Sequence, residues 1–140
     1  MHISGTRLLS RLQELADIGP IAGGGSCRLA LTDEDRFGRD LIVTWMKDLG
    51  LEISIDGIGN IVGTWNVGCG APVMTGSHID TVRTGGRYDG NLGVLAGLEV
   101  IETLMAAQLS PPRPLSVGVF TNEEGARFQP DMMGSLVFAG

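Results

Sequence analysis

Residues 74–97 read MTGSHIDTVRTGGRYDGNLGVLAG, and they hold the end of an expected strand, a glycine-rich loop and the start of an expected helix. The apolar run over 72–77 predicts a buried strand, and His78 and Asp80 follow at its end. The loop then leads to Asp89, directly before a helix predicted over 91–107. Polar side chains at the carboxyl end of a strand are typical of ligand sites in open α/β sheets.

The regions on either side of this stretch predict further helices and strands. Thr32 is the expected N-cap of a helix, because acidic residues fill the turn that follows it. Residues 51–55 alternate apolar with polar, and a turn over 56–60 leads to a second strand, as in a hairpin. The other expected elements are a helix over 5–17, the helix opened by Thr32 and closed by Gly50, the second hairpin strand over 61–65 and a buried strand over 115–120. This order predicts an α/β fold with helices on the faces of the sheet.

The composition is that of one globular domain. Hydrophobic residues make up 43% of the 140 residues and charged residues 19%, which argues against disorder. A formal net charge of −6 argues against nucleic acid and against an anionic membrane as partners. The sequence predicts no signal peptide and no membrane span, and Cys27 and Cys69 are isolated, so we expect a reduced, cytoplasmic protein.

His78 and Asp80 are two positions apart and therefore share a side while the chain is extended. An imidazole that binds a metal commonly donates its other N–H group to a carboxylate, which Asp80 could supply. Asp80 could also bind a metal directly. The simpler alternative is a half-buried loop histidine beside an aspartate that forms a turn.

The three remaining acidic candidates are Asp89, Glu123 and Glu124. Asp89 precedes a helix, so it could be an N-cap or a carboxylate that bridges two cations. Glu123 and Glu124 follow the strand over 115–120, where one could ligate a metal while the other transfers a proton. Adjacent acids can equally be solvated surface charge. Glycines alone would suit a nucleotide site, but neither GxGxxG in this loop nor GK[ST] anywhere occurs.

Several motifs together give a more specific indication. GSHIDTVRTGGRYDGNLGVLAGLE followed by FTNEEGARF resembles the M20 metallopeptidase superfamily. GGGSCRLALTDEDRFGRD, DGIGNIVGT and PDMMGSLVFAG resemble its amidase branch, which contains N-carbamoyl-L-amino-acid hydrolases, allantoate amidohydrolases and β-ureidopropionases. The resemblance implies a zinc-exopeptidase-like mixed sheet flanked by helices.

The resemblance also implies a role for each candidate residue. His78 and Glu124 would be terminal ligands of two divalent metal ions, zinc or manganese and in some members cobalt or nickel, with Asp89 bridging them. Glu123 would be the general base, and Asp80 the carboxylate that orients His78. The expected reaction is hydrolysis of a C–N bond in a small ureido or amide substrate, and the full-length enzyme is expected to be a homodimer.

Members of this family are considerably longer than 140 residues. Residues 1–140 are therefore expected to be the N-terminal part of the catalytic domain, without its C-terminal part and without the dimerisation and lid domain. Catalytic zinc ions normally have about three protein ligands, so one ligand per metal is missing, and we expect weak metal binding and no measurable hydrolysis from this piece. The alternatives are an M20 peptidase or deacylase, and a catalytically inactive module that keeps the fold.

Overall fold

The computed structural model describes residues 2–140, which form four helices and one four-stranded mixed sheet. The helices are α1 (Gly5–Ala16), α2 (Asp33–Asp48), α3 (Asn91–Ala106) and α4 (Met133–Ala139). The strands are β1 (Glu52–Ile55), β2 (Ile61–Trp65), β3 (Val73–His78) and β4 (Leu115–Phe120). The predicted mixed α/β fold is confirmed, and the predicted helices and strands lie within two residues of those observed. The short helix α4 was not predicted.

The strand order places the two polar segments side by side. Within the sheet the order is β1-β2-β4-β3, with β1 and β2 antiparallel, β2 and β4 antiparallel, and β3 and β4 parallel. His78 is therefore the register partner of Phe120. Because parallel strands end at the same edge of a sheet, the residues that follow β3 and β4 emerge next to each other.

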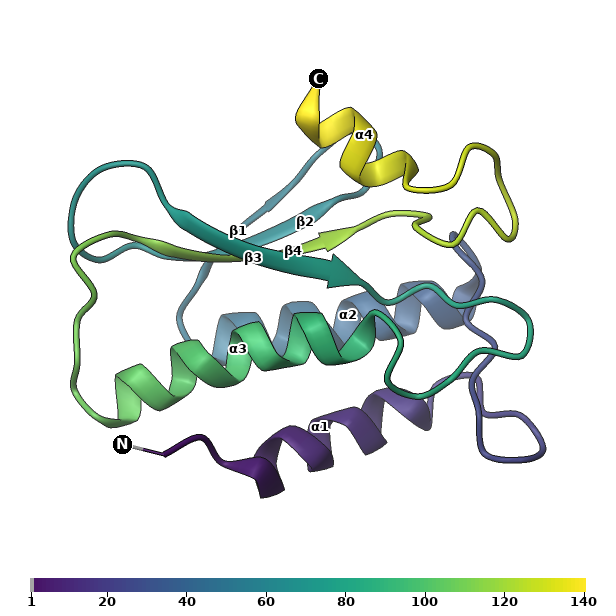
Figure 1. Cartoon of the computed structure of the whole chain (residues 1–140), viewed down its shortest axis with the longest axis horizontal. Helices are drawn as coiled ribbons and strands as arrows, with labels where there is room; N and C mark the ends of the chain where they lie inside the picture. Colours follow the sequence, from purple (N-terminus) through teal and green to yellow (C-terminus); the bar gives the residue numbers. More distant parts are fainter. Residues whose placement is uncertain (1) are drawn as a thin grey trace.

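The sheet separates two helical layers (Figure 1). Helices α2 and α3 pack on one face, α1 packs against α3, and α4 contacts β4 on the opposite face. Gly97 lets α3 lie close to the sheet, because a Cβ atom there would come within 2.8 Å of Thr75 Cγ2. The largest fully buried apolar side chains, which form the core between the helices and the sheet, are Leu15, Ile42, Met46, Ile79, Leu95, Leu98, Ile101, Val94, Val117 and Val119.

Local sequence signals explain the ends of several elements. The Thr32 hydroxyl accepts a hydrogen bond from the amide of Asp35, so Thr32 is the N-cap of α2, as predicted. Asp56 and Asn60 close the β1–β2 turn through backbone and side-chain hydrogen bonds. Cys27 and Cys69 are free thiols, as their isolated positions indicate.

The prediction that the strand over 72–77 is buried was wrong. Val73 is 49% exposed, and most of β3 is exposed or half-buried. The physical reason is its position, because β3 is an edge strand with only β4 as a neighbour among residues 2–140. An apolar run alone does not distinguish a central strand from an edge strand. Across residues 2–140, none of the helices combines the length and the apolar character that crossing a membrane requires.

Candidate metal and hydrolytic site

His78 is the last residue of β3, and its ring is held by the loop that follows. The side chain is buried, and Nδ1 lies 2.9 Å from the backbone oxygen of Asp80. A carbonyl oxygen can only accept a hydrogen bond, so Nδ1 carries the hydrogen atom. In the neutral ring Nε2 then has a free lone pair, which is the form in which histidine binds a metal.

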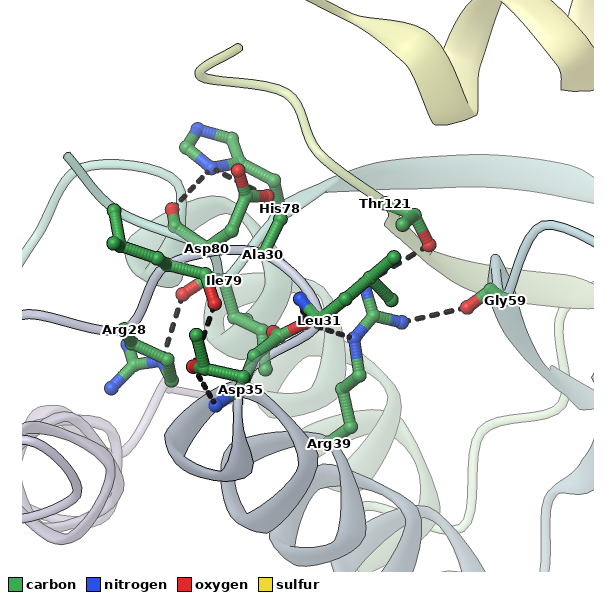
Figure 2. A network of polar contacts seen from close by, with 12 residues as sticks. Arg28, Ala30, Leu31, Asp35, Arg39, Gly59, His78, Ile79, Asp80 and Thr121 are labelled. Carbon is green, nitrogen blue, oxygen red and sulfur yellow. Dashed lines mark hydrogen bonds and ion pairs between the residues drawn. The ribbon is translucent and has the colours of Figure 1, made fainter. Parts of the chain in front are cut away.

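Asp80 makes a different set of contacts from the one its sequence position predicts. Its carboxylate is 1% exposed and accepts hydrogen bonds from the amides of Glu123 at 3.1 Å and Glu124 at 3.2 Å. Its Oδ1 atom lies 3.7 Å from His78 Nδ1, farther than the backbone oxygen of the same residue. Figure 2 shows the two contacts from His78 to Asp80. Asp80 therefore fixes the segment after β4 and orients His78 mainly through its main chain.

Glu123 brings a carboxylate to the free nitrogen of His78. The distance from His78 Nε2 to Glu123 Oε2 is 3.3 Å, and the Glu123 side chain is 37% exposed. The preceding residue, Asn122, has a left-handed φ of 54° and donates hydrogen bonds from Nδ2 to the oxygens of Phe128 and Pro130. This turn ends β4 and directs Glu123 back over the end of β3.

Glu124 lies in a region of concentrated negative charge. Burial is the largest cause that raises the pKa of its carboxyl group, and the charges of Asp89, Glu123 and Asp80 raise it further, while His78 lowers it. Carboxylates that share a small volume repel one another unless a proton or a cation compensates. A cation bound beside Glu124 would offset this unfavourable charge.

The N-cap alternative for Asp89 was wrong. The N-cap of α3 is Gly90, with a φ of 67°, and no side chain caps the helix. A Cβ atom at this glycine would lie 2.5 Å from His78 Nε2, so the backbone here passes directly over the imidazole. The Asp89 carboxylate is exposed and is not used as an N-cap.

The donor chemistry of this cluster suits a divalent cation. One imidazole nitrogen and several carboxylate oxygens are the ligands that zinc and manganese accept. Across residues 2–140, however, no three His, Cys, Asp or Glu side chains are grouped closely enough to hold an ion by themselves. The site therefore has side chains of the right chemistry for a metal ion, but residues 2–140 do not form a complete set of ligands by themselves.

Sequence reasoning missed a fully buried arginine beside this cluster. Arg28 is 0% exposed and donates from Nε to the backbone oxygen of Ile79, between His78 and Asp80 (Figure 2). It also donates from Nη2 to Asn91 Oδ1 at the start of α3. A charged residue in a glycine-rich loop is normally expected to be exposed, so the sequence did not indicate that Arg28 is buried. The only signal was the apolar character of the residues that follow it.

Comparison with known proteins gives consistent matches. The sequence profile of Peptidase family M28 matches residues 60–139. An N-carbamoyl-L-amino-acid amidohydrolase from Rhizobium meliloti is 44% identical over 99% of this chain, and an allantoate amidohydrolase from Bacillus subtilis is 38% identical over 89% of it. The crystal structure of a hydantoinase/carbamoylase family amidase from Burkholderia ambifaria superposes on 99% of this chain, with a TM-score of 0.95 and 50% identity.

The matched proteins are longer than this chain. The chain covers 34% of the Rhizobium protein, 31% of the Bacillus protein and 35% of the Burkholderia structure. It therefore spans about a third of the length of the proteins that it matches.

Proposed function

Because the chain belongs to the M28/M20-like family of amidases, we propose that it carries the metal-binding and proton-transfer residues of a C–N bond hydrolase. The observation that best supports this proposal is the convergence of β3 and β4 on one point. His78 Nε2 faces the Glu123 carboxylate at 3.3 Å, while Asp80 binds the amides of both glutamates. This arrangement places the Glu123 carboxylate next to the nitrogen that is free to bind a cation, so the carboxylate can transfer protons beside that cation.

We propose that His78, Asp89 and Glu124 would hold two divalent metal ions, zinc or manganese, with Asp89 shared by both. Because Nδ1 donates its hydrogen bond to the backbone oxygen of Asp80, the lone pair of His78 Nε2 is available to bind a metal. The like charges that raise the pKa of Glu124 would be compensated by a cation. When bound, such ions supply positive charge that makes a water molecule acidic and stabilises negative charge on the substrate.

Glu123 is the proposed general base. Its half-exposed carboxylate can accept a proton from an attacking water and then donate that proton to the departing nitrogen. Asp80 holds the Glu123 amide, and so fixes where this carboxylate acts. Each proton removed from water is thus delivered to the leaving group, and the carboxylate returns to its starting state.

The proposed substrates are small molecules with a ureido or amide group, such as N-carbamoyl amino acids or allantoate. The names of the two curated relatives support this class. The remaining proposals concern the whole protein: residues 1–140 form the N-terminal part of a catalytic domain, and the assembly is a homodimer in the cytoplasm. A peptidase or deacylase of the same family is the alternative, and a panel of N-carbamoyl amino acids, allantoate and dipeptides distinguishes the two.

The metal-binding part of the proposal is testable on the 140-residue chain. Calorimetric titration with Zn²⁺ or Mn²⁺ is expected to show weak binding that is lost in His78→Gln and in Glu124→Gln. The matched control is Glu123→Gln, which removes a charge from the same cluster and is expected to keep the binding. Equal binding by the wild type and His78→Gln would contradict the proposed ligand set, and ammonia release by a protein of the relatives' length tests the reaction itself.

A further inference from the structure

Arg28 makes hydrogen bonds to three separate parts of the fold. Nε donates to the oxygen of Ile79 at 2.8 Å, Nη1 to the oxygens of Leu15 and Ile18 at 3.0 Å each, and Nη2 to Asn91 Oδ1 at 3.0 Å. Burial lowers the pKa of the guanidinium to about 10, so Arg28 remains charged near neutral pH. All three guanidinium nitrogens are thus engaged inside the protein.

Two of these contacts hold the segments that carry proposed metal ligands. Ile79 directly follows His78, whereas Asn91 lies two residues after Asp89. Asn91 also donates from Nδ2 to the oxygen of Arg87, and so closes the loop that contains Asp89. Arg28 therefore connects the end of β3 with the loop that precedes α3.

The main chain of Arg28 strengthens the same connection. Its amide donates to Thr81 Oγ1 at 2.8 Å, and its oxygen accepts from the amide of Thr81 at 2.8 Å. The segment from His78 to Thr81 is thus bound to Arg28 at three points. The His78 ring also has little room to move on the side that faces Gly90, because a Cβ atom at Gly90 would lie 2.5 Å from His78 Nε2.

We infer that Arg28 is a positioning residue that sets the separation between the end of β3 at His78 and the loop before α3 that carries Asp89 and Gly90. The hydrogen bonds of Arg28 are independent of the proposed function, but the importance of this separation for metal binding rests on that function. A planar guanidinium reaches the three groups of acceptors in fixed directions at once, whereas an ammonium group is a single point of charge.

The experiment compares Arg28→Lys and Arg28→Met with the wild type by solution NMR of the 140-residue chain. The readout is the nuclear Overhauser effect between the Gly90 Hα protons and the His78 ring, which report on directly apposed groups. Glu99→Gln is the matched control, because it removes a buried, hydrogen-bonded charge two turns farther along α3.

The Overhauser effect is expected to weaken severalfold in both Arg28 variants and to stay unchanged in Glu99→Gln. Asn91→Ala leaves Arg28 in place but removes its bond to α3, together with the bond from Asn91 to the oxygen of Arg87, and is expected to weaken the effect even if Arg28→Met does not fold. An unchanged effect in folded Arg28→Lys and Asn91→Ala would overturn the inference.

A Zn²⁺ titration of the same variants separates this inference from the proposed function. We expect the Arg28 variants to bind Zn²⁺ about tenfold more weakly, the size typical of residues that orient metal ligands. If wild-type protein binds no Zn²⁺ while the Overhauser effect still depends on Arg28, the metal proposal fails and the positioning role stands. If Zn²⁺ binds equally to all variants and the effect is unchanged, the positioning role fails alone.

Discussion

Replacement of Asp80 by asparagine tests whether this side chain mainly holds the segment after β4 or mainly orients His78. The carboxylate is 1% exposed and accepts two amide hydrogen bonds, from Glu123 and Glu124. Asparagine keeps one acceptor oxygen and turns an amino group toward the second amide, so one bond is lost. A hydrogen bond to a charged group contributes about 1.5–3 kcal/mol, and the unpaired amide adds a desolvation cost. We therefore expect Asp80→Asn to lower the free energy of unfolding by about 2–3 kcal/mol.

Urea unfolding followed by tryptophan fluorescence measures this loss, and hydrogen exchange locates it. Exchange of the Glu123 and Glu124 amides is expected to accelerate about 30- to 150-fold in Asp80→Asn, the factor that corresponds to a loss of about 2–3 kcal/mol. Glu123→Gln is the control, because it leaves both amides and their acceptor in place. Unchanged exchange at these two amides, with a loss of stability below about 0.5 kcal/mol, would refute the role of Asp80 in holding the segment.

Three further predictions follow from contacts at the site and in the core. Gly90→Ala is expected to destabilise the protein by at least about 2 kcal/mol in thermal unfolding, because alanine is strained at a φ of 67° and its Cβ atom meets the His78 ring; wild-type stability would contradict the close approach. Burial acts to raise the pKa of Glu99, but hydrogen bonds led by that from Arg7 outweigh it and lower the pKa below its usual 4.5. Its stabilising contribution is therefore present above pH 4.5 and lost as the pH falls through the lowered value, so the melting temperatures of wild type and Glu99→Gln should converge in acid. In a protein of the relatives' length, Glu123→Gln is expected to reduce turnover at least about 100-fold with metal content unchanged, and loss of the metal would instead assign Glu123 as a ligand.

Much of the fold could be predicted because local signals and periodicity agree along the chain. Thr32 is followed by an acidic turn, the residues over 51–65 have strand alternation around a turn, and the residues over 91–107 have one apolar face. Each pattern depends only on residues that are close in the sequence, so it can be recognised without knowledge of the tertiary packing. The parallel pairing of β3 with β4 could be anticipated only indirectly, from the polar residues that follow both strands.

What the sequence could not reveal depends on contacts between distant segments. The burial of Arg28 requires the end of α1, the end of β3 and the start of α3 to surround one side chain. The contacts of Asp80 depend on the main chain after β4, which no spacing within residues 74–97 can specify. The exposure of β3 depends on which strand lies at the edge, and that is a property of the whole sheet.

The position of β3 also has a consequence for how the molecule behaves in concentrated solution. One side of this strand carries backbone amide and carbonyl groups with no neighbouring strand among residues 2–140, and its sequence, VMTGSH, contains neither proline nor lysine. Natural sheets commonly use such residues to discourage intermolecular pairing. Two copies that met along this edge could pair their β3 strands, so the apparent molar mass measured by light scattering should increase with protein concentration, and Val73→Lys should suppress the increase.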